Sequence, residues 1–153
     1  MGKSVLENSN QLNISQLILV KDTNIHIISK HFKKCADYTY LIEKLIRIMD
    51  VFANIQSTKK MNLFVNIVID FEDIVYSNVD FDFIKSLIHF FEEKYEDIIN
   101  IIYCTNVNIL FKVGYKIVKP FLSKDITCKL KFIKKGSSKI LDKINDDDDE
   151  FDD

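Results

Sequence analysis

The chain has 153 residues, of which 47% are hydrophobic and 29% are charged, and this balance predicts one domain with a substantial core. Only three glycines are present, which excludes the glycine loops that bind phosphates, and no apolar run approaches the roughly 18 residues of a membrane span. The three cysteines form no C-x-x-C motif and the first residues contain no signal-peptide core, so we expect free thiols in a soluble, cytoplasmic protein.

The net charge of −2 conceals a division of charge along the chain. The C-terminal sequence NDDDDEFDD carries seven of the 23 acidic residues, and without them the body of the chain has a net charge of about +5. We expect residues 145–153 to be a disordered acidic tail and residues 1–15 to be a flexible N-terminus. Such a tail either aids solubility or masks the basic surface of the body.

Two short strands are predicted first, over residues 16–22 and 24–29, and we expect them to form an antiparallel edge. Apolar residues at three- and four-residue intervals then predict a helix over residues 37–55. The run MNLFVNIVID, residues 61–70, is β-branched and almost entirely apolar, which is typical of a strand covered on both faces.

Helices and strands continue to alternate in the second half of the chain. The patterns predict a helix over 80–95 that begins near Asp80 or Asp82, a strand over 98–106, a helix over 107–122, a strand over 129–135 and a short helix over 137–144 capped by Ser137 or Ser138. The order β-β-α-β-α-β-α-β-α predicts an α/β fold with a mixed, mainly parallel sheet of about five strands flanked by helices.

Catalytic and metal-binding motifs are absent from the sequence. It contains no G-x-S-x-G or H-E-x-x-H, and the three histidines are not at ligand spacing, so we expect no enzyme activity, metal or other cofactor. Asp70, Glu72 and Asp73 follow a predicted strand, where they could hold a cation or transfer protons. Without a nucleophile beside them, a solvated turn is the simpler interpretation.

The helix predicted over 107–122 is apolar around most of its circumference. Lys112, Lys116 and Lys119 are spaced four and three apart and therefore share one face. Such a helix is either a core helix with three snorkelling lysines or a helix that binds an apolar, anionic surface such as a membrane.

The segment Lys94–Ile133 resembles the signature half of the CRAL-TRIO domain, the lipid-binding domain of phosphatidylinositol-transfer proteins. The likeness rests on a tyrosine with an acid two places later, an aliphatic strand ending in asparagine, a helix that ends in Lys-Pro-Phe-Leu, and a lysine opening the last strand: Tyr95, Asp97, Asn106, Phe111, Lys119, Pro120, Phe121, Leu122 and Lys129. Residues 16–144 would form the domain. The chain departs from the family pattern at Glu96, Val107 and Ile126.

The resemblance implies a gate over residues Val107–Asp125 that swings to admit a lipid. The gate and pocket residues would be Phe111, Tyr115, Val118, Pro120, Phe121 and Leu122. The three lysines would form a basic seam facing the membrane. Asp97 and Lys129 would contact the lipid headgroup, although Lys129 can also be read as an ordinary surface lysine at a strand end.

The function that the resemblance implies is non-catalytic binding, and transfer, of a phospholipid such as phosphatidylinositol or of another hydrophobic ligand. The protein would then be cytoplasmic and peripheral at membranes, with no nucleic-acid partner. The alternative is a divergent protein-interaction module with a collapsed pocket that binds a small GTPase or another regulatory partner. A regulator similar to the anti-sigma-factor antagonists is a third hypothesis, in which Ser77 lies nearest to their phosphorylated serine.

Overall fold

The structure is a computed structural model that describes residues 14–32, 37–59, 62–75 and 80–134. Ser77, the helix predicted over 137–144, the acidic tail and most of the predicted N-terminal segment lie outside the described residues.

Five strands form one sheet whose spatial order follows the sequence: β1 (Ile18–Lys21), β2 (Asn24–Ile28), β3 (Val65–Asp70), β4 (Ile99–Val107) and β5 (Leu130–Lys134). β1 pairs antiparallel with β2, and every other pair is parallel. The predicted mixed, mainly parallel sheet with an antiparallel edge is therefore confirmed.

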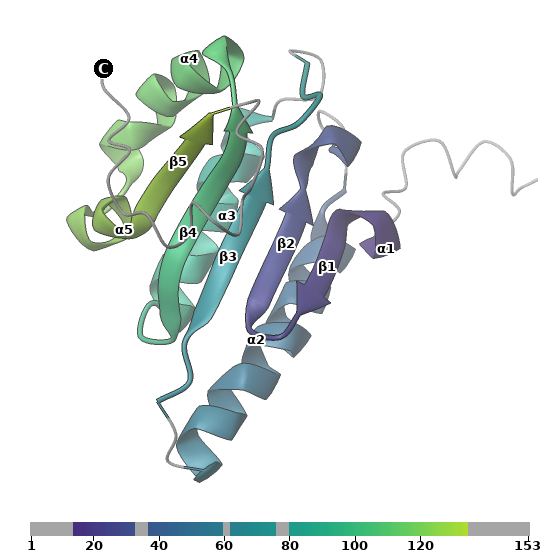
Figure 1. The fold of residues 1–153 in the computed structure, drawn as a ribbon, viewed down its shortest axis with the longest axis vertical. Coiled ribbons are helices and arrows are strands. Elements are labelled where there is room, and N and C mark those ends of the chain that lie inside the picture. Colours follow the sequence, from purple (N-terminus) through teal and green to yellow (C-terminus); the bar gives the residue numbers. More distant parts are fainter. Residues whose placement is uncertain (1–13, 33–36, 60–61, 76–79, 135–153) are drawn as a thin grey trace, which may run out of the picture.

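The described helices lie on one face of the sheet, as Figure 1 shows. They are α1 (Ile14–Leu17), α2 (Thr39–Lys59), α3 (Phe81–Tyr95), α4 (Ile109–Val118) and α5 (Lys124–Lys129), with 3-10 turns η2 (Ser29–His31) and η4 (Lys119–Phe121). Each parallel connection steps to the next strand in the same direction, and right-handed crossovers then place the helices on the same side. The expectation that β3 is covered on both faces agrees with its burial, since Ile67 and Ile69 are buried in the main core and Val68, on the opposite face, is buried as well.

Three helices begin at a polar side chain that accepts a hydrogen bond from a free backbone N–H. Asp80 caps α3, Asn108 caps α4 and Ser123 caps α5. The prediction of α3 with Asp80 at its start is confirmed. Helix α5 was not predicted, because six residues are too few to show a helical period. Residues 16–17 were predicted in a strand, whereas they end α1.

The main core lies between the sheet and the helices, and a smaller cluster lies on the opposite face of the sheet. Val68, Tyr103 and Ile133 form this second cluster, and Val68 is only 2% exposed. Near the amino ends of the parallel strands on the same face, three asparagines form a ladder. Asn66 Nδ2 donates to Asn24 Oδ1 at 3.0 Å, and Asn100 Nδ2 donates to Asn66 Oδ1 at 3.3 Å.

A bulge in β4 decides which residues face the main core. Val65 pairs with Ile99, but Ile67 pairs with Ile102, so β4 contains one extra residue over this interval. The side-chain alternation therefore shifts by one place. Ile102 and Cys104 belong to the main core, whereas Tyr103 belongs to the second cluster.

Candidate ligand-binding site

A small, partly enclosed cavity lies beneath α4, between that helix, α3 and strands β3 to β5. Its volume is about 50 Å³, and its walls are almost entirely apolar. The side chains that line it are Ile69, Phe71, Ile74, Phe81, Ile84, Ile88, Cys104, Leu110, Phe111, Tyr115, Val118, Leu122, Leu130 and Phe132, together with the backbone of Gly114.

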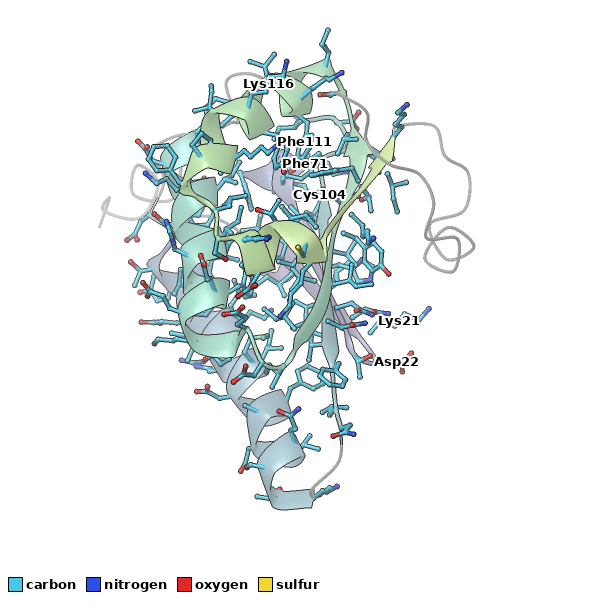
Figure 2. The ribbon with its side chains drawn as sticks, turned by 90° about the vertical axis from the view of Figure 1, so that its left-hand side faces the viewer. Lys21, Asp22, Phe71, Cys104, Phe111 and Lys116 are labelled. Atoms are coloured by element: carbon cyan, nitrogen blue, oxygen red, sulfur yellow. The ribbon has the colours of Figure 1, made fainter. Side chains whose placement is uncertain are left out.

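Four aromatic rings form a contiguous wall of this cavity. Phe111 lies 4.7 Å from Phe71 and 5.4 Å from Phe132, measured between ring centroids, and Tyr115 lies 4.9 Å from Phe132. Figure 2 shows Phe71, Phe111 and Cys104 together between α4 and the sheet. Since two of the rings belong to α4, any movement of α4 opens or closes this wall.

The lining of the cavity is apolar and contains no ionised group among the described residues. Burial raises the pKa of the Cys104 thiol to about 12, so the thiol stays neutral at physiological pH. No charged side chain is present among the described residues that line the cavity, and such an apolar lining suits hydrocarbon rather than a phosphate. A water molecule needs roughly 10–15 Å³ of such volume, so the cavity has room for a few atoms and must expand to admit an acyl chain.

Helix α4 is packed tightly at one point and exposed along its outer side. Gly114 is buried, and a Cβ atom built on it would overlap Cε1 of Phe81 and lie 3.0 Å from Cζ, so glycine permits the close approach of α4 to α3. At the far end, Lys85 Nζ of α3 lies 3.5 Å from the centroid of the Phe121 ring. These contacts hold the helix over the cavity.

The outer side of α4 carries an apolar stripe. We call Ile109, Val113, Ile117 and Phe121 the outer stripe. They repeat every four residues, and Ile109 is 82% exposed while the other three are about half exposed. Lys116 and Lys119 are exposed beside them, Lys112 is partly buried, and Figure 2 shows Lys116 on the outer side of the helix. This surface is therefore both apolar and basic.

Comparison with known proteins decides the family. A model of the CRAL/TRIO domain matches residues 12–150. The chain belongs to the CRAL/TRIO domain family. A solved structure described as the crystal structure of Sfh5 has the same fold, with a TM-score of 0.50 and 16% sequence identity over 84% of this chain and 50% of that one. The chain therefore spans about half the length of that structure, and no match was found among the curated proteins.

In this CRAL/TRIO domain, the gate segment expected over Val107–Asp125 consists of several elements. It contains the last residue of β4, the whole of α4 and η4, and the first two residues of α5. Pro120 lies in η4, beyond the C-cap residue Lys119, so the proline interrupts no α-helix. The prediction of one helix continuing to residue 122 is wrong, because α4 ends at Val118.

The structure separates the predicted gate and pocket residues into two groups. The side chains of Phe111, Tyr115, Val118 and Leu122 line the cavity. Pro120 and Phe121 do not line it, and both are exposed in η4.

The two residues predicted for the headgroup lie at the amino ends of their strands, outside the cavity lining. Lys129 Nζ donates to the backbone carbonyl of Glu96 at 2.6 Å, which places Lys129 next to the segment that contains Asp97. Asp97 lies in an open, mixed-polarity groove with Asp50 and Tyr95. In that groove Tyr95 Oη donates to Asp50 Oδ1 at 2.7 Å, and burial, together with this bond, raises the pKa of Tyr95 to about 12.

The acids at the end of β3 form a hydrogen-bonded turn. Asp70 Oδ1 accepts from Asn106 Nδ2 at 2.8 Å and from the backbone N–H of Glu72 at 2.9 Å. Among the residues that the structure describes, no group of three potential ligands could hold a metal ion. Within the same residues, no helix is long and apolar enough to cross a membrane.

Sequence reasoning missed several contributors to the site. Gly114, Cys104 and Lys85 act through tertiary contacts that have no signature in one sequence. The outer stripe could have been predicted from the sequence, because its apolar residues repeat at every fourth position and therefore share one face of a helix. The apolar pattern of α4 did not by itself separate this side of the helix from the side that faces the cavity.

Proposed function

We propose that this domain binds a phospholipid or another hydrophobic ligand, without catalysis, in the cavity beneath α4, and that it does so at membrane surfaces. The observation that supports the proposal is an apolar, partly enclosed cavity roofed by a helix whose outer side is also apolar. A core helix needs only one apolar face. A second one suits a helix that leaves the protein interior for a bilayer as the ligand enters.

The apolar walls are sufficient to supply affinity. Burial of hydrocarbon contributes about 0.8 kcal/mol per methylene, so ten methylenes contribute about 8 kcal/mol, which corresponds to micromolar binding before the cost of opening the cavity. The cavity would select for the chain of the ligand. Contacts outside it, at Lys129 and Asp97 in our proposal, would select for the headgroup.

The basic outer surface of α4 would bring the domain to anionic bilayers. Each lysine near such a surface contributes about 1 kcal/mol, and the outer stripe would add apolar contacts with the headgroup region. The domain would thus be a peripheral membrane protein that moves α4 at the bilayer and exchanges its ligand there.

Native mass spectrometry of the purified full chain tests ligand binding. We expect co-purified lipid, and we expect its loss in Phe111→Asp, because a carboxylate in the aromatic wall disfavours hydrocarbon. Lys129→Ala should change which lipid is bound. Val51→Asp is the matched control, since Val51 is 58% exposed on α2 and is not among the residues that line the cavity. A folded protein that carries no lipid, even after incubation with mixed-lipid vesicles, contradicts the proposal.

Vesicle sedimentation tests the membrane surface separately. Ile117→Asp should reduce binding to vesicles that contain phosphatidylserine at least fivefold, whereas Val51→Asp should leave binding unchanged. Equal binding of the two variants would exclude the outer stripe as the docking surface.

One observation favours a second function. The cavity is small, and its aromatic rings are packed against each other, which also suits a protein-interaction module whose pocket has collapsed. A purified chain that carries no lipid and does not bind vesicles, but that unfolds cooperatively on heating, would favour this alternative.

A further inference from the structure

We propose that the acidic C-terminal segment, residues 146–153, folds back onto the outer side of α4 and competes with anionic membranes for that surface. The contact within the chain is independent of the proposed function, whereas the competition with membranes rests on it. The segment lies outside the described residues. The outer surface of α4, the place where the chain leaves β5 and the sequence of the segment support the contact.

The chain leaves the described fold beside the start of α4. Lys134, the last residue of β5, pairs with Val107 at the end of β4, and α4 begins two residues later at Ile109. Residues after Lys134 therefore start at the edge of the sheet from which α4 departs.

The connecting segment has a suitable length. Eleven residues, 135–145, separate β5 from the acidic run. A random coil of eleven residues spans about 17–20 Å on average and at most about 40 Å when extended, and the helix predicted over residues 137–144 would be about 12 Å long. Helix α4 has ten residues and is therefore about 15 Å long. The acidic run reaches the whole helix without strain, and the short tether gives it a millimolar effective concentration there.

The charges of the two partners are complementary. From Ile109 to Leu122 the chain contains lysines but no acidic residue, and Lys116 and Lys119 are exposed. The segment 146–153 presents seven carboxylates. Single exposed ion pairs are weak, but several pairs on one tether act together and are screened by salt.

The apolar parts of the two partners also match. The segment contains one non-acidic residue, Phe151, set among carboxylates, and the outer stripe is a row of exposed aliphatic side chains beside lysines. We infer that Phe151 packs on Val113 and Ile117 while the neighbouring carboxylates meet Lys116 and Lys119. A tail that only aids solubility needs no aromatic residue at this position.

Cross-linking with a zero-length carbodiimide, followed by peptide mass spectrometry, tests the contact without any membrane. In a dilute mixture of ¹⁴N- and ¹⁵N-labelled full chains, we expect the most frequent tail cross-links to join 146–153 to Lys116 or Lys119 of the same molecule. High salt or Phe151→Ser should reduce them at least threefold. The contact is excluded if the tail prefers Lys131, Lys134 or Lys21, if the cross-links join different molecules, or if none form. Figure 2 shows Lys21 at a distance from α4, so the readout separates these surfaces.

Sedimentation with phosphatidylcholine vesicles containing one-tenth phosphatidylserine tests the competition. A variant in which every acid of 146–153 is replaced by its amide keeps the length of the tail, and we expect it to bind at least fivefold more tightly than the natural chain. Equal binding overturns the competition. If intramolecular cross-links form but neither protein binds vesicles, the proposed membrane function fails while the contact between tail and helix stands.

Discussion

The contact between Gly114 and Phe81 allows a sharp test of how α4 is held. We consider Gly114→Ala, which adds one methyl group where the Phe81 ring already lies. Forcing an extra methyl into a packed contact costs about 1–3 kcal/mol, while alanine in place of glycine inside a helix contributes about 1 kcal/mol of stability. We expect a net loss of about 1 kcal/mol, which lowers the melting temperature of a domain of this size by about 2–4 °C.

The same substitution in a Phe81→Ala background isolates the contact. With the ring removed, Gly114→Ala should stabilise the domain by up to about 1 kcal/mol, so the interaction energy of the two sites is about 2 kcal/mol. Urea unfolding of the four proteins measures it. Val113→Ala, on an exposed position of the same helix, is the control and should change stability by less than about 0.5 kcal/mol. If Gly114→Ala stabilises both backgrounds equally, α4 does not press against α3 as described.

Three further predictions concern single side chains. Iodoacetamide at pH 8 should modify the exposed Cys128 and spare Cys104, because burial raises the pKa of Cys104 to about 12. Mass spectrometry measures the alkylation rate of each thiol, and equal rates would mean that solvent reaches Cys104. Because the pKa of Tyr95 is raised to about 12, its neutral form stabilises the fold fully below pH 10, and this contribution should disappear as the pH rises towards 12. Tyr95→Phe should remove this part of the fall in unfolding free energy at alkaline pH, measured by urea denaturation. If the fall is the same in the variant, other groups cause it. Asp80→Ala should cost about 0.5–2 kcal/mol in urea unfolding because it removes the cap of α3, whereas Asp80→Asn should cost much less, and equal costs would show that the cap is not responsible.

Much of the fold could be predicted from local sequence patterns. The apolar run that became β3 and the spacing that became α3 are strong signals, and the alternation of strands and helices led to the mixed sheet. Helix α5 escaped because it is short, and the end of α4 was placed four residues too late because the apolar pattern continues through η4. Strong periodicity identifies an element better than it locates its ends.

The candidate site was only partly accessible to sequence reasoning. The resemblance suggested a helix over a pocket, and four of the six side chains predicted there line the cavity. The volume of the cavity, the fit of Gly114 against Phe81 and the exposure of Ile109 depend on how distant segments pack, which a single sequence does not report.

The extra residue in β4 has a consequence for ligand selectivity. Had the ladder stayed regular beyond Ile99, the residues turned towards α4 would be Ile101, Tyr103 and Thr105, and a phenol and an alcohol would stand where Cys104 now lies. Those hydroxyls would demand polar partners and would draw water or a polar ligand into the space. The bulge in β4 thus keeps the sheet side of the cavity apolar, and homologues with a regular β4 should bind a more hydrophilic ligand.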